Sequence, residues 1–311
     1  MQPKVLALSV ILILVLYFSA CSLIKQETMI GYYRRGIDHY NQGNYKPMAA
    51  DFSAALRINP QFASEYNYRG IAYDNLGKFD RAISDYSSAL KLDPEFADAY
   101  YNRGLVYTKQ KKYELAIADY TAALQINPQY TNAYINRGIT YYYQYQYNLA
   151  VADYTAALQI DPKDIIAYAN RGLTYSCQWK YDLAIVDYNS ALELDPQYTF
   201  AYMNRGHCYF CQNKFDLAIE DYTLAIHLNP NDAIAYKHRG EAYVQQGKFE
   251  LAILDYSTAI KLNPEDASAY FGRGYVYYCQ GKEKKTTADY KAGFRIQPMR
   301  VIPYDDSSPT K

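Results

Sequence analysis

The sequence lacks the signals of most enzymes and nucleic-acid-binding proteins. Its 32 basic and 32 acidic residues balance, so no basic field predicts nucleic acid as a partner and no acidic tail predicts a cation store. It contains no glycine-rich phosphate loop, no HExxH zinc motif and no GxSxG nucleophile motif. We therefore expect a protein that is not an enzyme and that carries no cofactor and no metal.

Tryptophan and long apolar runs are also scarce. A single tryptophan stands among 39 tyrosines and 11 phenylalanines, so tyrosine supplies most of the aromatic surface. The longest apolar run, Val5–Phe18, is shorter than the roughly 20 residues that a helix needs to cross a bilayer. The abundant tyrosines must therefore be explained by the organisation of the rest of the chain.

Internal repetition organises the chain. Arg-Gly pairs, aspartate followed by an aromatic residue, and proline each recur every 34 residues. The period is clearest for proline, which occurs at Pro60, Pro94, Pro128, Pro162, Pro196, Pro230, Pro264 and Pro298. The sequence predicts eight repeats, over 29–62, 63–96, 97–130, 131–164, 165–198, 199–232, 233–266 and 267–300.

Each repeat is predicted to hold two amphipathic helices joined by a polar turn. In the third repeat three residues share one face of the first helix, and three share one face of the second. They are Tyr100, Gly104 and Tyr107, then Ala116, Tyr120 and Ala123. The tyrosine rings are expected to fill the seams between helices. The mid-helix glycine costs about 1 kcal/mol against alanine, so its recurrence predicts the close approach of another backbone.

This pattern resembles the tetratricopeptide repeat (TPR), a helix–turn–helix unit of 34 residues. Tyr100 matches the first aromatic position of the family and Gly104 its small residue, and the later positions match down to Pro128. The resemblance implies an all-α fold, a right-handed superhelical solenoid. The first helix of each repeat (the A helix) would line a concave groove, and the second (the B helix) would lie outside.

The sequence departs from the family at one position of every repeat. Arginine stands at position 7, where the family usually has leucine, and aspartate follows 16 residues later at position 23. We predict an Arg–Asp ladder between the two helices, bidentate where the geometry permits, which fixes the register of similar repeats more than it adds stability. Its central pairs are Arg103 with Asp119, Arg137 with Asp153, and Arg171 with Asp187.

The groove is predicted to bind an extended peptide or protein segment. The resemblance places Tyr101, Tyr142, Phe200 and Phe210 on the concave face, as an aromatic strip. Position 6 is asparagine in four consecutive repeats, at Asn102, Asn136, Asn170 and Asn204. A row of amides can hold a peptide backbone, and this row resembles the asparagine ladder of O-linked N-acetylglucosamine transferases. The alternative is that these amides only complete local hydrogen bonds.

Two smaller groups of residues are expected to be structural. Cys177, Cys211 and Cys279 share position 13, and equivalent positions of adjacent repeats are too far apart for a disulfide, so free thiols packed as small hydrophobic groups are expected. His207 and Cys211 neighbour His238 across a repeat boundary, and these residue types can bind zinc. Chance proximity is the favoured explanation.

The amino terminus predicts export and lipid anchoring. An apolar run followed by small residues and Cys21 is typical of a secretory signal and resembles a bacterial lipoprotein signal. We expect a signal peptide over 1–20, acylation of Cys21, a tether over 21–28 and a disordered tail over 301–311. The repeats would then lie in the bacterial cell envelope, in the periplasm or at the surface. The alternative is an uncleaved transmembrane anchor.

The sequence thus indicates a non-enzymatic, membrane-anchored scaffold whose partners are another protein and, through its amino terminus, the lipid membrane. An alternative is an envelope assembly factor, similar to pilotin-like or outer-membrane assembly lipoproteins, that would use convex or terminal surfaces. An intracellular scaffold, as in photosynthetic complexes, would require another interpretation of the amino terminus.

Overall fold

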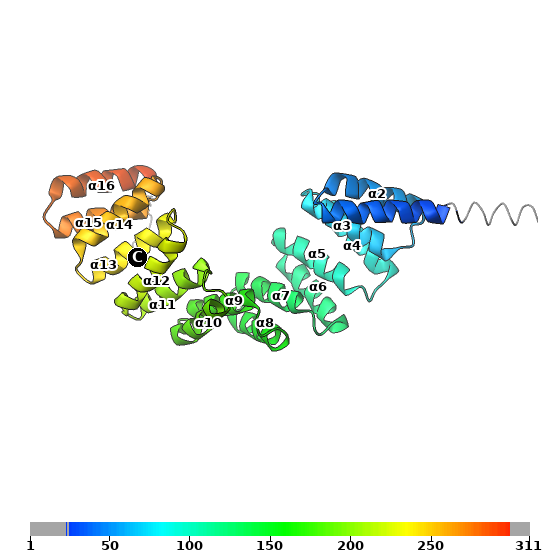
Figure 1. The fold of residues 1–311 in the computed structure, drawn as a ribbon, viewed down its shortest axis with the longest axis horizontal. Helices are drawn as coiled ribbons and strands as arrows, with labels where there is room; N and C mark the ends of the chain where they lie inside the picture. The colour runs from blue at the N-terminus through cyan, green and yellow to red at the C-terminus, as the bar shows by residue number, and fades with distance from the viewer. Residues whose placement is uncertain (1–22, 24, 299–311) are drawn as a thin grey trace, which may run out of the picture. The chain divides into compact units, whose positions relative to one another are not determined.

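The computed structural model describes residue 23 and residues 25–298, and all regular secondary structure in this part is helical (Figure 1). The expected signal peptide, Cys21 and the tail over 301–311 lie outside the described residues. No helix of the described part has the length and apolar character needed to cross a membrane. The chain divides into two compact units, one ending at Asp161 and one beginning at Pro162.

Unit one holds the first four helix pairs. Residues 25–41 belong to its first A helix, so residues 25–28, expected in the tether, are helical. The remaining helices are α2 (Tyr45–Ile58), α3 (Ala63–Asn75), α4 (Phe79–Leu92), α5 (Ala97–Lys109), α6 (Tyr113–Ile126), α7 (Thr131–Tyr143) and α8 (Tyr147–Ile160).

Unit two holds the other four helix pairs. Its helices are α9 (Ile165–Cys177), α10 (Tyr181–Leu194), α11 (Thr199–Cys211), α12 (Phe215–Leu228), α13 (Ala233–Gln245), α14 (Phe249–Leu262), α15 (Ala267–Cys279) and α16 (Glu283–Ile296). In both units the odd-numbered helices are A helices and the even-numbered helices are B helices.

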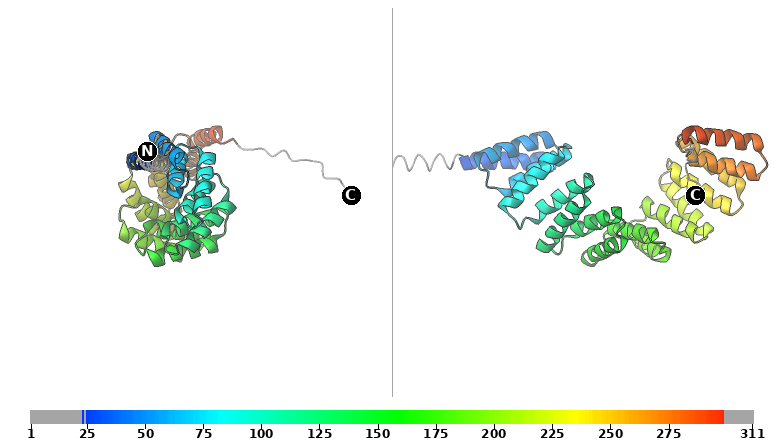
Figure 2. Two further views of the ribbon diagram at one scale, coloured as in Figure 1. Left: turned by 90° about the vertical axis from the view of Figure 1, so that its right-hand side faces the viewer. Right: turned by 180° about the vertical axis from the view of Figure 1, so that it is seen from behind.

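Packing within each unit is serial. Every A helix packs on the B helix of its own pair, and that B helix packs on the A helix of the next pair (Figure 2). Successive A helices also touch, as α5 touches α7 and α11 touches α13, so the A helices of a unit share one face. The predicted all-α array of helix pairs is confirmed within each unit.

The turn between the two helices of a pair requires a left-handed residue at position 15. Four repeats place glycine there, at φ of about +70°. The other four place Lys111, Tyr145, Trp179 and Asn213 in the same conformation, at φ between 58° and 64°. Tyr145 and Trp179 are bulky residues in this strained region, and each is 80% exposed.

The mid-helix glycines pack against tyrosine rings, and this corrects the prediction that a second backbone approaches them. A Cβ on Gly104 would lie 2.8 Å from Cε1 of Tyr120, whose ring is fully buried. On Gly70 it would lie 2.6 Å from Cε1 of Tyr86. The ring comes from position 24, directly after the ladder aspartate. Glycine at position 8 therefore makes room for the largest side chain of the core.

Candidate functional site

The asparagines of unit one join neighbouring A helices. Asn102 donates from Nδ2 to Oδ1 of Asn67, at 3.0 Å. Asn136 donates to the hydroxyl of Tyr101 at 3.1 Å and to the main-chain oxygen of Asn132 at 2.9 Å. The amides of this unit are therefore held in place by contacts between repeats.

The asparagines of unit two bond within their own helices. Asn170 donates to the carbonyl oxygen of Ile166 at 2.9 Å, and Asn204 donates to that of Phe200 at 2.8 Å. The local hydrogen bonds that the alternative interpretation of the asparagine row expects are therefore present at Asn170 and Asn204. Each such bond uses one of the two amide hydrogens, so the amide group also brings a second N–H and an acceptor oxygen to the face.

Each of the four aromatic residues predicted for the groove has its own local surroundings. Tyr101 packs against Tyr130, with ring centroids 4.9 Å apart, and burial together with the charge of Asp98 raises its pKa. Tyr142 packs against neighbouring tyrosine rings at the end of α7, and Phe210 against Phe215 at the turn after α11. Phe200 is 39% exposed and faces a pocket.

This pocket lies between α11 and α13 in unit two and has a volume of about 430 Å³. It brings together two predicted site residues, Phe200 and Asn204, with other residues of the A-helix face, among them His207 and His238, which the sequence had placed beside each other. Its full lining is Thr199, Phe200, Met203, Asn204, His207, Asp232, Ile234 and His238. The sequence signal for the additional residues is that Met203, His207, Ile234 and His238 stand at positions 5, 9, 2 and 6 of their repeats.

Two histidines form the polar wall of the pocket. Their ring centroids lie 6.5 Å apart. His238 hydrogen-bonds through Nδ1 to Glu241 at 2.8 Å, and its ring stacks on Tyr222. His207 Nε2 lies 3.6 Å from the thiol of Cys211. Burial and the neighbouring His238 lower the pKa of His207. Among residues 25–298, no group of three or more His, Cys, Asp or Glu residues is arranged to hold a metal ion.

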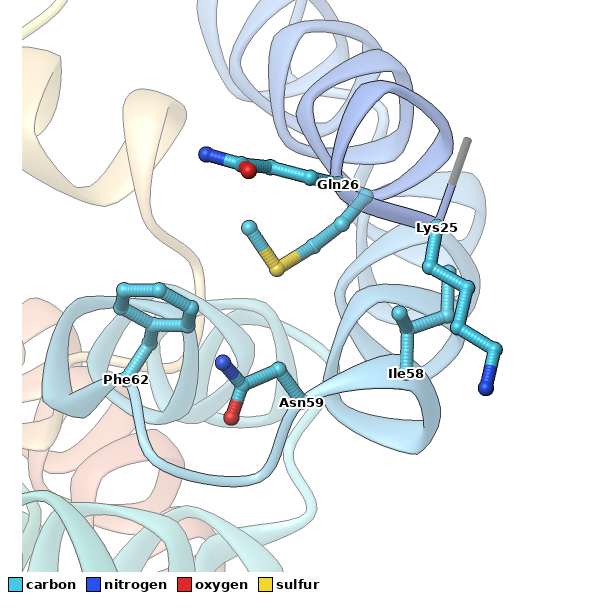
Figure 3. A pocket seen from close by; sticks show the side chains of 6 residues that line it. Lys25, Gln26, Ile58, Asn59 and Phe62 are labelled. Carbon is cyan, nitrogen blue, oxygen red and sulfur yellow. The ribbon is translucent and has the colours of Figure 1, made fainter. Parts of the chain in front are cut away.

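A second pocket, of about 380 Å³, lies at the start of unit one. The first turns of the helix over 25–41 form one wall, and the end of α2 with the loop that follows forms the other. Figure 3 shows Gln26 on the first wall and Phe62 on the second. This pocket contains none of the predicted site residues.

Arginine and aspartate meet in all eight repeats of the described part. Arg103 donates from Nε and Nη2 to the two carboxylate oxygens of Asp119, both at 2.8 Å. The other central pairs, Arg137 with Asp153 and Arg171 with Asp187, show the same bidentate geometry at 2.7–2.9 Å. Burial raises the pKa of Asp153 even though Arg137 acts in the opposite direction. A bidentate pair of this kind fixes how the two helices of a repeat are aligned.

A third partner of these arginines was missed by sequence analysis. Nη1 of Arg137 donates to the hydroxyl of Thr121, at position 25 of the preceding repeat, at 2.9 Å. Position 25 has a side-chain hydroxyl or amide in seven of the eight repeats: Ser53, Ser87, Thr121, Thr155, Asn189, Thr223 and Ser257. The eighth repeat has Lys291 there. Within each unit these guanidinium groups therefore connect one repeat to the next.

Comparison with known sequences and structures agrees with the repeat pattern. Family profiles described as tetratricopeptide repeats match residues 69–131, 131–164, 165–198 and 199–232, and one described as a TPR repeat matches residues 240–281. A search of curated protein sequences finds no match.

Solved structures resemble the chain over most of its length. A tetratricopeptide repeat protein from Parabacteroides merdae is 22% identical, with a TM-score of 0.60 over 80% of this chain and 99% of its own. The C-terminal part of a TPR protein from Cytophaga hutchinsonii is 20% identical, with a TM-score of 0.65 over 77% and 98%. YrrB, described as a TPR protein with an unusual peptide-binding site, is 25% identical, with a TM-score of 0.52 over 59% and 95%.

Proposed function

The chain belongs to the tetratricopeptide repeat family, and we propose that it binds an extended segment of a partner protein on the A-helix face. The observation that carries this proposal is the face formed by α9 and α11. Over their lengths these helices contain no Asp, Glu or Lys, and their only arginines, Arg171 and Arg205, belong to the ladder. The face instead offers amides beside exposed apolar side chains, a combination that suits a peptide backbone and its side chains.

Asparagine and apolar side chains have separate roles in this proposal. Asn170 and Asn204 stand at the same position of adjacent repeats, so their amides can pair with successive peptide groups of an extended chain. Ile166 and Phe200, 48% and 39% exposed, lie one turn away and contact the partner's side chains. YrrB, described as a TPR protein with an unusual peptide-binding site, supports peptide binding as a function by similarity.

Replacing the four position-6 asparagines with alanine tests the proposal. Binding should weaken by about 0.5–1.5 kcal/mol for each hydrogen bond to the partner that is lost, and the melting temperature should fall only by the loss of the Asn102–Asn67 and Asn136–Tyr101 bonds. A photo-crosslinking residue at Phe200 should capture the partner in native cells, and one at Leu217 on the outer side of α12 is the matched control. Capture through Leu217 alone, together with full affinity of the fourfold variant, would reject binding on the A-helix face.

The outer surface of the B helices supports the alternative function in envelope assembly. Leucine at position 19 is 41–49% exposed in five repeats, at Leu115, Leu149, Leu183, Leu217 and Leu251. Within each unit these leucines form a row on the B helices, and exposed apolar rows of this kind are typical of contact surfaces. A folded partner would use this row, which is why the crosslink at Leu217 separates the two functions.

Membrane anchoring through Cys21 is part of the proposed function. The small residues before Cys21 and the apolar run to Phe18 support acylation and a location in the bacterial cell envelope. Cells fed a clickable palmitate analogue should label the wild-type chain and leave the Cys21→Ala variant unlabelled. Labelling of that variant would reject the lipid anchor.

A further inference from the structure

We propose that the pocket between α11 and α13 selects a large, uncharged apolar side chain of the bound segment, and that acidification weakens this selection. The proposal rests on the proposed function, because a segment must lie on the A-helix face for its side chains to reach the pocket. It adds the chemical class of the partner and a condition under which the partner is released.

The apolar side chains that line the pocket are exposed to an entering group, and one of them packs against the buried core. Phe200 is 39% exposed and Ile234 is 53% exposed, so one ring and one branched side chain face the entering group from two helices. Met203 packs against a buried cluster that includes Ala225 and Ala235, so its side chain forms a supported floor. An apolar side chain entering here exchanges water for contact on three sides.

The charges at the pocket are already engaged. Oδ1 of Asp232 accepts the main-chain N–H groups of Ile234 and Ala235 at the start of α13, at 2.9 and 3.3 Å. Glu241 is bonded to His238. The lining residues include no lysine or arginine, so an acidic side chain would find no cation and would meet Asp232. A basic side chain would lose its hydration against Phe200, Met203 and Ile234, and would regain only an interaction with Asp232, whose Oδ1 is already engaged at the start of α13. The pocket therefore favours a neutral apolar side chain.

The histidine pair makes this preference sensitive to pH. His207 faces His238 and Glu241 of α13 and Cys211 of its own helix, while Tyr222 of α12 covers the ring of His238. The pKa of His207 is lowered, so this imidazole is neutral at pH 7 and gains a proton only below its ordinary range. An apolar side chain placed over it excludes water and disfavours the charged form further.

The direction of the pH dependence follows from the difference between the pKa of His207 in the complex and its pKa in the free protein. Because the pKa of His207 is lower in the complex than in the free protein, affinity is highest when the imidazole is neutral and falls as the pH drops through the free-state pKa. Each pH unit below that pKa weakens binding by up to about tenfold until the complex itself is protonated. The charge of Glu241 raises the pKa of His207, because it favours the protonated imidazole, and so opposes the effect of burial and of His238.

Capped amino acids test the chemistry of the pocket one side chain at a time. The probes are N-acetyl-leucine amide, N-acetyl-glutamate amide and N-acetyl-lysine amide, added to the full chain labelled with ¹³C in histidine. The chain has four histidines, so His39 and His227 serve as internal controls. The leucine probe should shift the ring signals of His207 and His238 alone, and its Kd should rise between pH 7 and pH 5.5, by less than about tenfold because the pKa of His207 is lowered. Equal shifts from the three probes would overturn the proposal.

Variants separate this proposal from the proposed function. Ile234→Glu should abolish the leucine shifts, whereas Ile166→Glu, at the same position on α9 and 48% exposed, should leave them intact. His207→Gln should bind the leucine probe at pH 7 and show a weaker pH dependence than the wild type. Unchanged pH dependence in that variant would overturn the role of His207. If the crosslink at Phe200 still captures a partner while the probes fail, the A-helix face binds a segment and the pocket proposal alone is wrong.

Discussion

Removing Arg137 should destabilise the protein far more than removing both members of its ladder pair. Asp153 is 5% exposed and receives two hydrogen bonds from Arg137, so Arg137→Met leaves a buried carboxylate without its cation. Breaking a buried pair in this way costs about 3–5 kcal/mol, whereas replacing both partners with apolar residues is often nearly neutral. The double variant Arg137→Met with Asp153→Leu should therefore be more stable than Arg137→Met alone.

The pH dependence of the single variant identifies the cause of its instability. Burial raises the pKa of Asp153 even in the wild type, so ionisation of this carboxyl opposes folding. Loss of Arg137 raises that folded-state pKa further. A folded-state pKa above the unfolded value means that stability falls as the pH rises through it. The deficit of Arg137→Met should thus be full at pH 7 and should shrink as the pH approaches 5.

Urea unfolding followed by circular dichroism measures both effects. The first repeat supplies the control, since the side chain of Arg35 is 59% exposed while that of Arg137 is 16% exposed. The same cycle on Arg35 and Asp51 should show much weaker coupling, because water screens that pair. Additive single variants at Arg137 and Asp153, or a deficit that does not change with pH, would refute the reasoning.

Three further variants test the packing. Gly70→Ala should lower the melting temperature, because the added Cβ would lie 2.6 Å from the buried ring of Tyr86. Gly240→Ala is the control and should be nearly neutral, because the nearest atom to its Cβ would lie at 3.3 Å. Equal effects of the two variants would contradict this explanation. Trp179→Gly should raise the urea midpoint by relieving about 1 kcal/mol of left-handed strain, and a lower midpoint would show that the ring stabilises the turn. Thr121→Val should cost about 1 kcal/mol in urea unfolding, by removing the acceptor of Nη1; no change would rule out a stabilising bond.

The helix pairs could be predicted from sequence periodicity because the same pattern recurs in eight successive repeats of the chain. The spacing of 16 residues also put position 7 opposite position 23, and Arg137 and Asp153 are in contact. The neighbour of the mid-helix glycine could not be predicted in the same way. Recurrence shows that a Cβ is excluded, but it does not show whether backbone or a ring such as that of Tyr120 excludes it.

The third ladder partner and the pocket show two different limits of prediction from the sequence. Thr121 and its equivalents repeat in the sequence, so a signal existed, but a hydroxyl on a helix is ordinarily read as facing solvent. The sequence placed His207 beside His238 across a repeat boundary, and the rings are neighbours, but the pocket that they form with Phe200 and Ile234 depends on side-chain packing between α11 and α13. The asparagine row was visible in the sequence, yet its local hydrogen bonds to residues such as Ile166 depend on side-chain geometry.

Position 25 also bears on how such an array can grow during evolution. A duplication or deletion of one whole repeat inside either unit gives the next arginine another serine, threonine or asparagine, so gene rearrangements in steps of 34 codons keep the connections between repeats. A copy added behind the eighth repeat would place its guanidinium beside the ammonium of Lys291. Changes of repeat number in the interior therefore keep these hydrogen bonds, while a repeat added at that end would gain no such bond from Lys291.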